Sequence, residues 1–350
     1  MPTLNADQLT DLSTRILTGA SIPPEDAAVI ARELTGANLV GHDSHGVMRL
    51  MQYVQMIDDG FVQIGGEFEV VVDEPAFSLI DGHLNYGQVI ATKALELTME
   101  KARKTGTATA MIRDCNHVGR LGSYADRAAN EGFAVAMAVN GPGIGGVAPF
   151  GGMERKMGTN PICMAAPRAG ANFVLDMTTS ATAEGKLRVS YQKGEQVPPG
   201  MMIDGHGNPS TDPADYYNEP HGCILPLGGP LLGHKGYGLS VLIDVFCGMI
   251  TGSGICRTDR SPGANGVWLY LLDIERFTSR AEYDALTEKY TEHMKSCKRM
   301  PGVDEILLPG EIEARRKQQR EAEGVAIPDE TWRQINELAD KLDVSIADIG

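Results

Sequence analysis

The hydrophobic pattern of this chain changes its period near Phe68, and this change constrains the fold more than any other feature. Before it, apolar residues recur at helical spacing and predict three helices, over 5–17, 24–39 and 44–59. After it, short β-prone runs alternate with helical segments, and residues 310–348 return to a helical pattern that is broken near Pro328. The sequence therefore predicts helical segments at both ends that bracket an α/β core.

The α/β core is predicted from β-branched runs and from helical periodicity. The predicted strands are 69–72, 107–113, 133–139, 162–165, 172–175 and 266–272, and the clearest predicted helices are 88–104, 121–130, 237–250 and 280–296. We expect residues 1–75 and 300–350 to pack together as one discontinuous helical domain. Residues 76–299 are then the α/β domain.

Charge and cysteine usage narrow the function classes. The 350 residues carry a formal net charge of −15, which argues against nucleic-acid binding because that function needs a basic face. The first ten residues lack the features of a signal peptide, and the most apolar stretch, 236–250, is too short to span a bilayer. The six cysteines form no C-x-x-C pair and are expected to be reduced and mostly buried. These features predict a cytoplasmic protein that is not membrane-bound.

Residues 141–146 match the pattern G-x-G-x-x-G and follow a predicted strand, as a dinucleotide-binding fingerprint should. That fingerprint also needs a helix to open at once, so that its N-terminus faces the pyrophosphate. Here Pro142 lies inside the motif, and Pro149, Gly151 and Gly152 follow it. We therefore expect a glycine-rich loop rather than a Rossmann turn.

The segment Gly41–Leu50 is the first candidate site. Ser44 is predicted to cap the third helix, which would place His45 in its first turn and keep its pKa near or slightly below neutrality. Such a histidine suits proton transfer, and Arg49 one turn later could bind a substrate carboxylate. Two alternatives stay open: a helix cap with incidental histidines, or a metal site that also uses His42 and Asp43.

Three further segments place polar residues at strand ends or helix starts, where ligands collect. His117 lies between a predicted strand and a helix, and Asp176 ends a predicted strand next to hydroxyl residues. Lys235 lies between glycines at the predicted start of an apolar helix, where it opposes the helix dipole and could serve an anion. For each segment, ordinary turn, capping or solvated side chains are the structural alternative.

Taken together, the motifs resemble those of the type-2 malate/L-lactate dehydrogenase family, and they are closest to the branch called hydroxycarboxylate dehydrogenase B. The matching stretches occur in the family's order between residues 43 and 316: DSHGVMRL, NHVGRLGSYA, GTNPICMAAP, VLDMTTSATAEGK, KGEQVPPG, STDPADYY, LPLGG, GHKGYGLSVLIDVFCG and LLPGEIEARR. The segment 252–266 matches poorly, which leaves substrate size and subunit contacts there undefined.

The resemblance implies a mostly antiparallel, non-Rossmann α/β sheet, a helical domain formed by both termini, and a homodimer with sites near its interface. It implies NAD or NADP as the cofactor and His45 as the proton donor, with His117 as the competitor for that role. The cofactor contacts that it implies are His45, Gly119, Arg120, Leu121, Asp176, Met177, Thr178, Thr179, Ser180, Lys235, Asn265, Pro309, Gly310 and Glu311.

The resulting hypothesis is an NAD(P)-dependent oxidoreductase that interconverts 2-hydroxy acids and 2-oxo acids. His45, His117 and Asp176 are the candidate catalytic residues, and Ser44 and Arg49 are the candidate substrate-binding residues. A cyclic imine (piperideine-2-carboxylate) reductase is the alternative within the family. A metal-dependent hydrolase using His42, Asp43, His45 and His117 is the alternative from another class. A non-enzymatic binding protein is disfavoured because the sequence shows no unused hydrophobic stripe.

Overall fold

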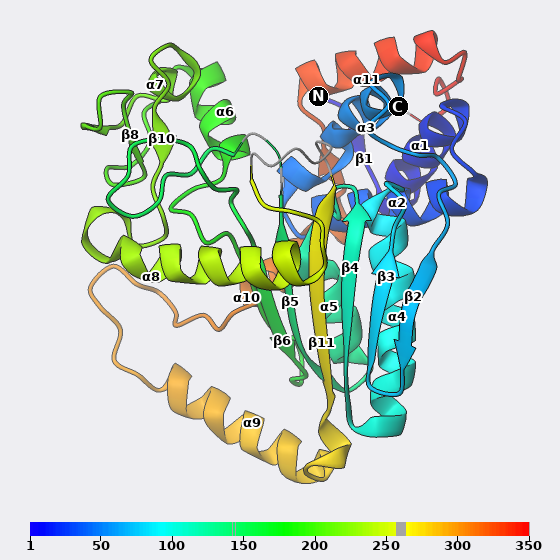
Figure 1. Cartoon of the computed structure of the whole chain (residues 1–350), viewed down its shortest axis with the longest axis vertical. Coiled ribbons are helices and arrows are strands. Elements are labelled where there is room, and N and C mark those ends of the chain that lie inside the picture. Colours follow the sequence, from blue (N-terminus) through cyan, green and yellow to red (C-terminus); the bar gives the residue numbers. More distant parts are fainter. Residues whose placement is uncertain (142, 144, 257–263, 350) are drawn as a thin grey trace.

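A seven-stranded sheet forms the centre of the computed structural model, which describes residues 1–141, 143, 145–256 and 264–349 (Figure 1). Across the sheet the strands are β2 (Glu69–Glu74), β3 (Phe77–Asp81), β4 (Thr107–Cys115), β11 (Asn265–Asp273), β5 (Phe133–Asn140), β6 (Ile162–Ala166) and β7 (Phe173–Met177). All neighbouring strands are antiparallel except β3 and β4. The predicted mostly antiparallel α/β fold is confirmed.

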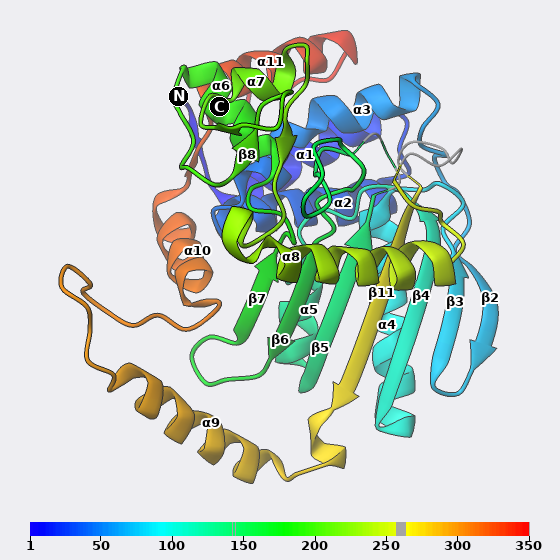
Figure 2. The same ribbon diagram turned by 60° about the vertical axis from the view of Figure 1, so that its left-hand side comes forward.

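Helices cover both faces of this sheet. The helices α4 (Gly87–Thr105) and α5 (Leu121–Asn130) pack on one face, and α4 makes the crossover that the parallel pair β3–β4 requires. On the other face lie α8 (Gly229–Ile243) and the π-helix Asp244–Ile250 (Figure 2). Gly266 permits this close packing, because a Cβ there would lie 1.5 Å from the carbonyl oxygen of Cys247.

The two ends of the chain meet in a helical unit beside the sheet. It contains α1 (Ala6–Gly19), α2 (Pro24–Leu39), α3 (Leu50–Asp58) and α11 (Asp329–Lys341), and the short strands β1 (Thr3–Leu4) and β12 (Val325–Ala326) pair antiparallel between them. One apolar cluster joins residues of both ends, among them Leu9, Ile30 and Ile335. The proposed domain boundaries, 1–75 with 300–350 and 76–299, stay a prediction.

Smaller elements surround the core. A three-stranded sheet of β8 (Met202–Ile203), β9 (Pro209–Ser210) and β10 (Cys223–Ile224) packs near α6 (Glu184–Lys193) and α7 (Ala214–Tyr217). The helix α9 (Arg280–Lys295) extends away from the sheet, and the chain returns through α10 (Glu311–Glu323) to the helical unit (Figure 2). No residue of α9 is buried.

The expected glycine-rich loop is present where the structure describes it. After β5 the chain forms an isolated bridge between Val147 and Met157 and then β6, and the next helix is α6. Pro142 and Ile144 of the motif, and residues 257–263 of the segment that departs from the family, lie outside the described residues. Five of the six cysteines are buried, as expected, and Cys297 is exposed.

No helix in the described part of the chain is long and apolar enough to cross a membrane. The cytoplasmic location stays a prediction.

Several predicted element boundaries are wrong. The strand β3 was not predicted, because as a strand near the sheet edge it carries a mixed pattern of exposed and buried residues. The apolar helix α8 begins at Gly229, eight residues before the predicted start at Tyr237, because Gly228 with φ +99° and Pro230 in the first turn open it there. The third helix, expected from residue 44, begins only at Leu50.

Candidate active site

The segment that carries His45 is a pair of 3₁₀ turns, Asp43–His45 and Val47–Arg49, rather than a helix start. Asn38 at the end of α2 prevents a continuous helix: its side-chain oxygen accepts a hydrogen bond from the Val47 amide at 2.8 Å, and its amide donates to Asp43 at 2.7 Å. Asp43 also binds Arg320 of α10 at 2.6 Å. The predicted Ser44 helix cap is therefore wrong.

Ser44 instead contacts His45. The Ser44 hydroxyl lies 3.1 Å from His45 Nδ1, and the start of α6 packs against the Ser44 side chain, since a Cβ on Gly185 would lie 3.6 Å from it. The stretch VLDMTTSATAEGK, which ends at Lys186, thus reaches the His45 segment through Gly185. Residues 141 positions apart in the sequence meet at this point.

The two candidate histidines lie face to face. The rings of His45 and His117 have centroids 5.5 Å apart and an interplanar angle of 20°, and both residues are partly exposed. His117 follows β4, and α4 begins against its backbone. A Cβ on Gly87 would lie 2.0 Å from the Asn116 carbonyl oxygen and 2.7 Å from the His117 carbonyl group. Glycine at this position therefore permits the contact that places His117 opposite His45.

The surroundings of both imidazoles favour their neutral forms. Burial lowers the pKa of His45 to about 4, helped by the positive charges of Arg49, His42 and Arg120. Burial, with Arg49 and His45 nearby, holds the pKa of His117 well below its usual range. The expectation of a His45 pKa near neutrality differs from this result, because it assumed a position in the first turn of a helix and took no account of burial and the neighbouring cations.

Arg49 lies beside the two histidines and has N–H donors that the described residues do not use. Its Nε donates to the Ser44 carbonyl oxygen at 2.6 Å, and its Nη1 donates to the Gln52 side chain. A guanidinium has five N–H donors, so these two bonds hold the group in place and leave others for a ligand. A carboxylate bound there would lie next to both imidazoles.

Asp176, at the end of β7, caps the start of α5. Its Oδ2 accepts a hydrogen bond from the Gly122 amide at 2.7 Å and lies 3.8 Å from Arg120 Nε. A Cβ on Gly122 would lie 3.0 Å from this oxygen and 2.5 Å from Arg120 Nη2, so only glycine fits without a shift. The start of α5, a place where ligands were expected to collect, is thus occupied, in part, by the protein's own carboxylate.

The hydroxyl groups of the residues after Asp176 form hydrogen bonds with backbone carbonyl groups near the end of β7. The Thr179 hydroxyl donates to the carbonyl oxygens of Thr159 and Asn160, at 3.1 and 2.9 Å, and the Ser180 hydroxyl donates to that of Thr182 at 2.7 Å. Both residues are buried. For these two side chains the structure favours the turn-forming alternative over a ligand contact. Met177 and Thr178 are partly exposed beside them.

Of the predicted cofactor residues Asn265 and Lys235, only Asn265 makes a described contact close to one of the two histidines. Asn265, at the start of β11, pairs with Cys115 of β4, two residues before His117. Lys235 is exposed in the second turn of α8 rather than at its N-terminus, and no described contact joins it to either histidine. The prediction that Lys235 lies at a helix N-terminus is therefore wrong, because α8 begins six residues earlier, at Gly229.

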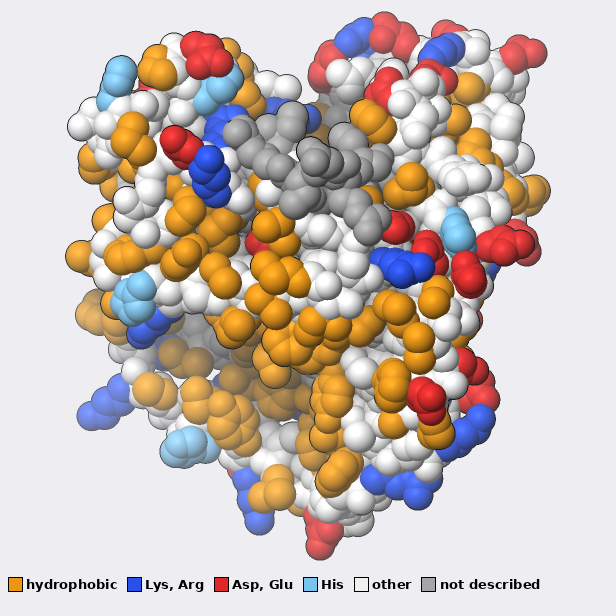
Figure 3. All heavy atoms as spheres, viewed as in Figure 1, with side chains coloured by type: hydrophobic (Ala, Val, Ile, Leu, Met, Phe, Trp, Pro, Cys, Tyr) orange, Lys and Arg blue, Asp and Glu red, His pale blue; other side chains and the backbone are white. Residues whose placement is uncertain are grey.

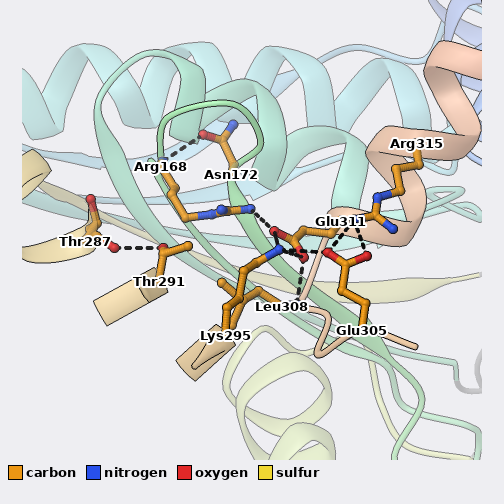
Figure 4. Close-up of polar contacts among 9 residues, drawn as sticks. All are labelled: Arg168, Asn172, Thr287, Thr291, Lys295, Glu305, Leu308, Glu311 and Arg315. Atoms are coloured by element: carbon orange, nitrogen blue, oxygen red, sulfur yellow. Dashed lines mark hydrogen bonds and ion pairs between the residues drawn. The ribbon is translucent and has the colours of Figure 1, made fainter. Parts of the chain in front are cut away.

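The turn Pro309–Glu311 lies beside the start of β7, where the Pro309 carbonyl oxygen accepts a hydrogen bond from Val174 at 3.2 Å. The Glu311 carboxylate is buried and bound to Arg168 at 3.1 Å, to Lys295 at 2.9 Å and to the Leu308 amide at 3.0 Å (Figure 4). Gly310, with φ +94°, packs against the Asn172 carbonyl oxygen. These bonds fix the turn, and α10 continues from it to Glu313, which lies 3.6 Å from His42.

The side chains that the metal-site alternative would use as ligands contact other residues of the protein. Asp43 is bound by Arg320, His42 faces Glu313, and His45 faces Ser44. Within the described ranges, no group of three His, Cys, Asp or Glu side chains is placed to hold a metal ion.

Sequence patterns missed two residues of this region, Tyr53 and Gln88. The Tyr53 hydroxyl lies 2.8 Å from His117 Nδ1, and the Gln88 amide donates to the same hydroxyl at 2.5 Å. Neither residue belongs to a recognisable motif, and both occupy buried helix positions, which the sequence does not distinguish from other core positions.

Comparison with known proteins gives a consistent result over nearly the whole chain. The sequence model for "Malate/L-lactate dehydrogenase" matches residues 4–336. A malate dehydrogenase of Pyrococcus abyssi is 36% identical over 345 residues, covering 97% of this chain and 94% of that protein. Hydroxycarboxylate dehydrogenase B of Escherichia coli K12 is 36% identical over 324 residues, covering 90% and 87%. A structure described as a putative malate/lactate dehydrogenase from E. coli superposes with a TM-score of 0.92 at 31% identity, covering 100% and 98%.

Proposed function

Because this chain belongs to the malate/L-lactate dehydrogenase family, we propose that it is an NAD(P)-dependent oxidoreductase that interconverts 2-hydroxy acids and 2-oxo acids. The observation that carries the proposal is the stacking of His45 on His117 beside Arg49. In this arrangement an imidazole that could transfer a proton lies next to a guanidinium that could bind a carboxylate. A 2-hydroxy or 2-oxo acid needs both groups, because its carboxylate and its reacting oxygen are on neighbouring carbon atoms.

The residues near the histidines are chemically suited to a nicotinamide nucleotide. Asp176 uses Oδ2 for Gly122 and Arg120, and its Oδ1 has no protein partner in the described part of the chain, so it could accept a ribose hydroxyl. Gly119, with φ +75°, and Leu121 belong to the segment that joins His117 to the start of α5, which this carboxylate caps. The bound nicotinamide supplies the hydride chemistry.

The chain's own residues bind the acid and move the proton. Arg49 holds the substrate carboxylate. His45, kept neutral by burial and by neighbouring cations, accepts the hydroxyl proton when a 2-hydroxy acid is oxidised. In the reverse direction the bound carboxylate offsets the charge of Arg49, which raises the pKa of His45 and favours the protonated form that donates to the 2-oxo oxygen.

A spectrophotometric panel tests this function. Wild-type enzyme is mixed with NADH or NADPH and with pyruvate, oxaloacetate, phenylpyruvate, hydroxyphenylpyruvate, sulfopyruvate or piperideine-2-carboxylate. We expect nucleotide oxidation with at least one 2-oxo acid, unchanged by EDTA. Turnover of the cyclic imine alone would support the imine reductase instead. Absence of nucleotide-dependent turnover, with metal-dependent hydrolysis, would support the hydrolase.

We also propose that the enzyme is a homodimer, on the basis of its exposed apolar face. Contrary to the sequence-based expectation, an unused hydrophobic stripe is present along α8 and the π-helix (Figure 3). Its exposed members are Leu231, Leu232, Leu239, Val241, Leu242, Phe246, Met249 and Ile250. A contiguous apolar surface of this kind is typical of a subunit interface. The exposed helix α9 would extend beside it.

Charge introduced into the stripe should separate the subunits. The double variant Leu242→Glu/Met249→Glu buries two carboxylates in the proposed interface, so we expect a particle of one 37.6 kDa chain where the wild type gives twice that mass. Light scattering after size exclusion measures the mass. Phe77→Glu, which adds charge at an exposed residue of the β2–β3 hairpin, is the matched control. A monomeric wild type would contradict the dimer proposal.

A further inference from the structure

His117 is anchored on one side by a chain of hydrogen bonds that the reaction scheme above does not use. Its Nδ1 lies 2.8 Å from the Tyr53 hydroxyl, and the Gln88 side-chain amide donates to that hydroxyl at 2.5 Å. Tyr86 completes the anchor by donating to the Tyr53 carbonyl oxygen at 2.7 Å. Tyr53, Tyr86 and Gln88 are buried. The chain therefore runs from the protein interior to the partly exposed imidazole.

The donors and acceptors in this chain set its polarity. Gln88 supplies a proton to the Tyr53 oxygen, so the proton of the Tyr53 hydroxyl is free to point to His117. Nδ1 of His117 is the acceptor that the described contacts place within reach of this proton, which favours the ring form with its own proton on Nε2. Burial raises the pKa of Tyr53 to about 12 and lowers that of His117, so both groups are neutral at physiological pH.

The orientation of the Gln88 amide has an energetic cost. Its Oε1 is buried and has no hydrogen-bond partner among the described residues. A buried unsatisfied acceptor is unfavourable, and the reversed amide would instead leave a buried N–H unsatisfied, which proteins tolerate less. A buried glutamine with this defect is a poor core residue. A need for its one bond, to the Tyr53 hydroxyl, would account for a polar side chain at this position.

We propose that Gln88 and Tyr53 are positioning residues that hold His117 as a neutral hydrogen-bond donor through Nε2, facing the substrate oxygen that His45 protonates. Tyr53 occupies Nδ1, and no described residue bonds to Nε2, so Nε2 is the ring nitrogen that is left for a ligand. A fixed neutral donor stabilises negative charge on that oxygen without itself transferring a proton. This division of roles between the two histidines rests on the proposed function.

The tautomer of His117 can be read directly in the free protein. Two-bond ¹H–¹⁵N correlation spectra of ¹⁵N-histidine-labelled protein distinguish the two neutral forms, and loss of a signal in His117→Gln assigns it among the 8 histidines. We expect the wild type to show the Nε2–H form alone. In Gln88→Leu and Tyr53→Phe we expect a mixture of both tautomers, because the polarity of the chain is no longer imposed.

A matched control and a kinetic readout complete the test. Gln55→Leu, which removes an exposed glutamine bound to Asp59, should leave the His117 spectrum unchanged. Gln88→Leu should lower kcat about tenfold with little change in KM, the pattern of a bond made mainly in the transition state. An Nδ1–H wild type, or unchanged tautomers in Gln88→Leu and Tyr53→Phe, would overturn the proposal. A wild type that shows Nε2–H but no nucleotide-dependent turnover would instead refute the proposed function.

Discussion

Replacing His45 with alanine is expected to lower kcat by roughly 10²–10⁴-fold, the range that a positioned general acid or base contributes. The variant should still fold and bind the nucleotide, because the His45 side chain is only partly buried and its described hydrogen bond is to its neighbour Ser44. Steady-state turnover in both directions, nucleotide binding by fluorescence and a thermal melt measure the three properties. Turnover like that of the wild type would transfer the proton role to His117.

The pH profile supplies an internal control for this result. The pKa of His45 is lowered to about 4, so its neutral, proton-accepting form is present above that pH. In the wild type, kcat/KM for oxidation of the hydroxy acid should stay level through neutral pH and fall only as the pH approaches 4 from above. His45→Ala should lose this acidic limb. A limb near pH 6.5, the ordinary histidine value, would contradict the proposed environment of the ring.

Gly87→Ala is expected to destabilise the protein by about 1–3 kcal/mol and to lower kcat as well. The added Cβ would lie 2.0 Å from the Asn116 carbonyl oxygen, a backbone atom that cannot rotate away. Relief requires α4 and the Asn116–His117 segment to separate, which displaces His117 from His45. Displacements of about 1 Å at a reacting site can cost roughly 10²-fold in rate. Urea unfolding and kcat are measured on the same preparation.

Gly36→Ala is the matched control for that substitution. Gly36 lies inside α2, and a Cβ there would meet nothing within 4 Å. Alanine should therefore stabilise the protein, by about 0.5–1 kcal/mol, through its higher helix propensity. If Gly87→Ala unfolded like Gly36→Ala and kept full activity, the contact between α4 and the His117 segment would have no role in placing the ring.

Local signals in the sequence predicted much of the fold. Asn5 and Gln8 form the capping box that starts α1, and the helices α2 and α5 have the predicted bounds. Buried and partly buried residues alternate along the first half of β5 and along much of β11. Such features depend on neighbouring residues, so periodicity and capping rules are sufficient to find them.

The errors occur where distant residues decide the local structure. Ser44 has every local property of a helix cap, but Asn38 takes the Val47 amide and Arg320, far along the sequence, takes Asp43. The same limit applies to the site. Motifs identified His45, His117 and Asp176, whereas Tyr53 and Gln88 act through their contact with His117, which only the folded chain brings together.

The shared core of the two chain ends also bears on how this protein is made. The strand β1 is synthesised before the sheet, yet its partner β12 and the helix α11 that completes the same apolar cluster are synthesised after it. At translation rates of about 5–20 residues per second, the first helices would wait for roughly 15–60 s before their partners exist. During that interval the α/β sheet can already form, and α10 then brings Arg320 to Asp43 beside His45. The loop that carries the proposed proton donor would thus gain this contact only once α10 has been synthesised, after the sheet strands of its site.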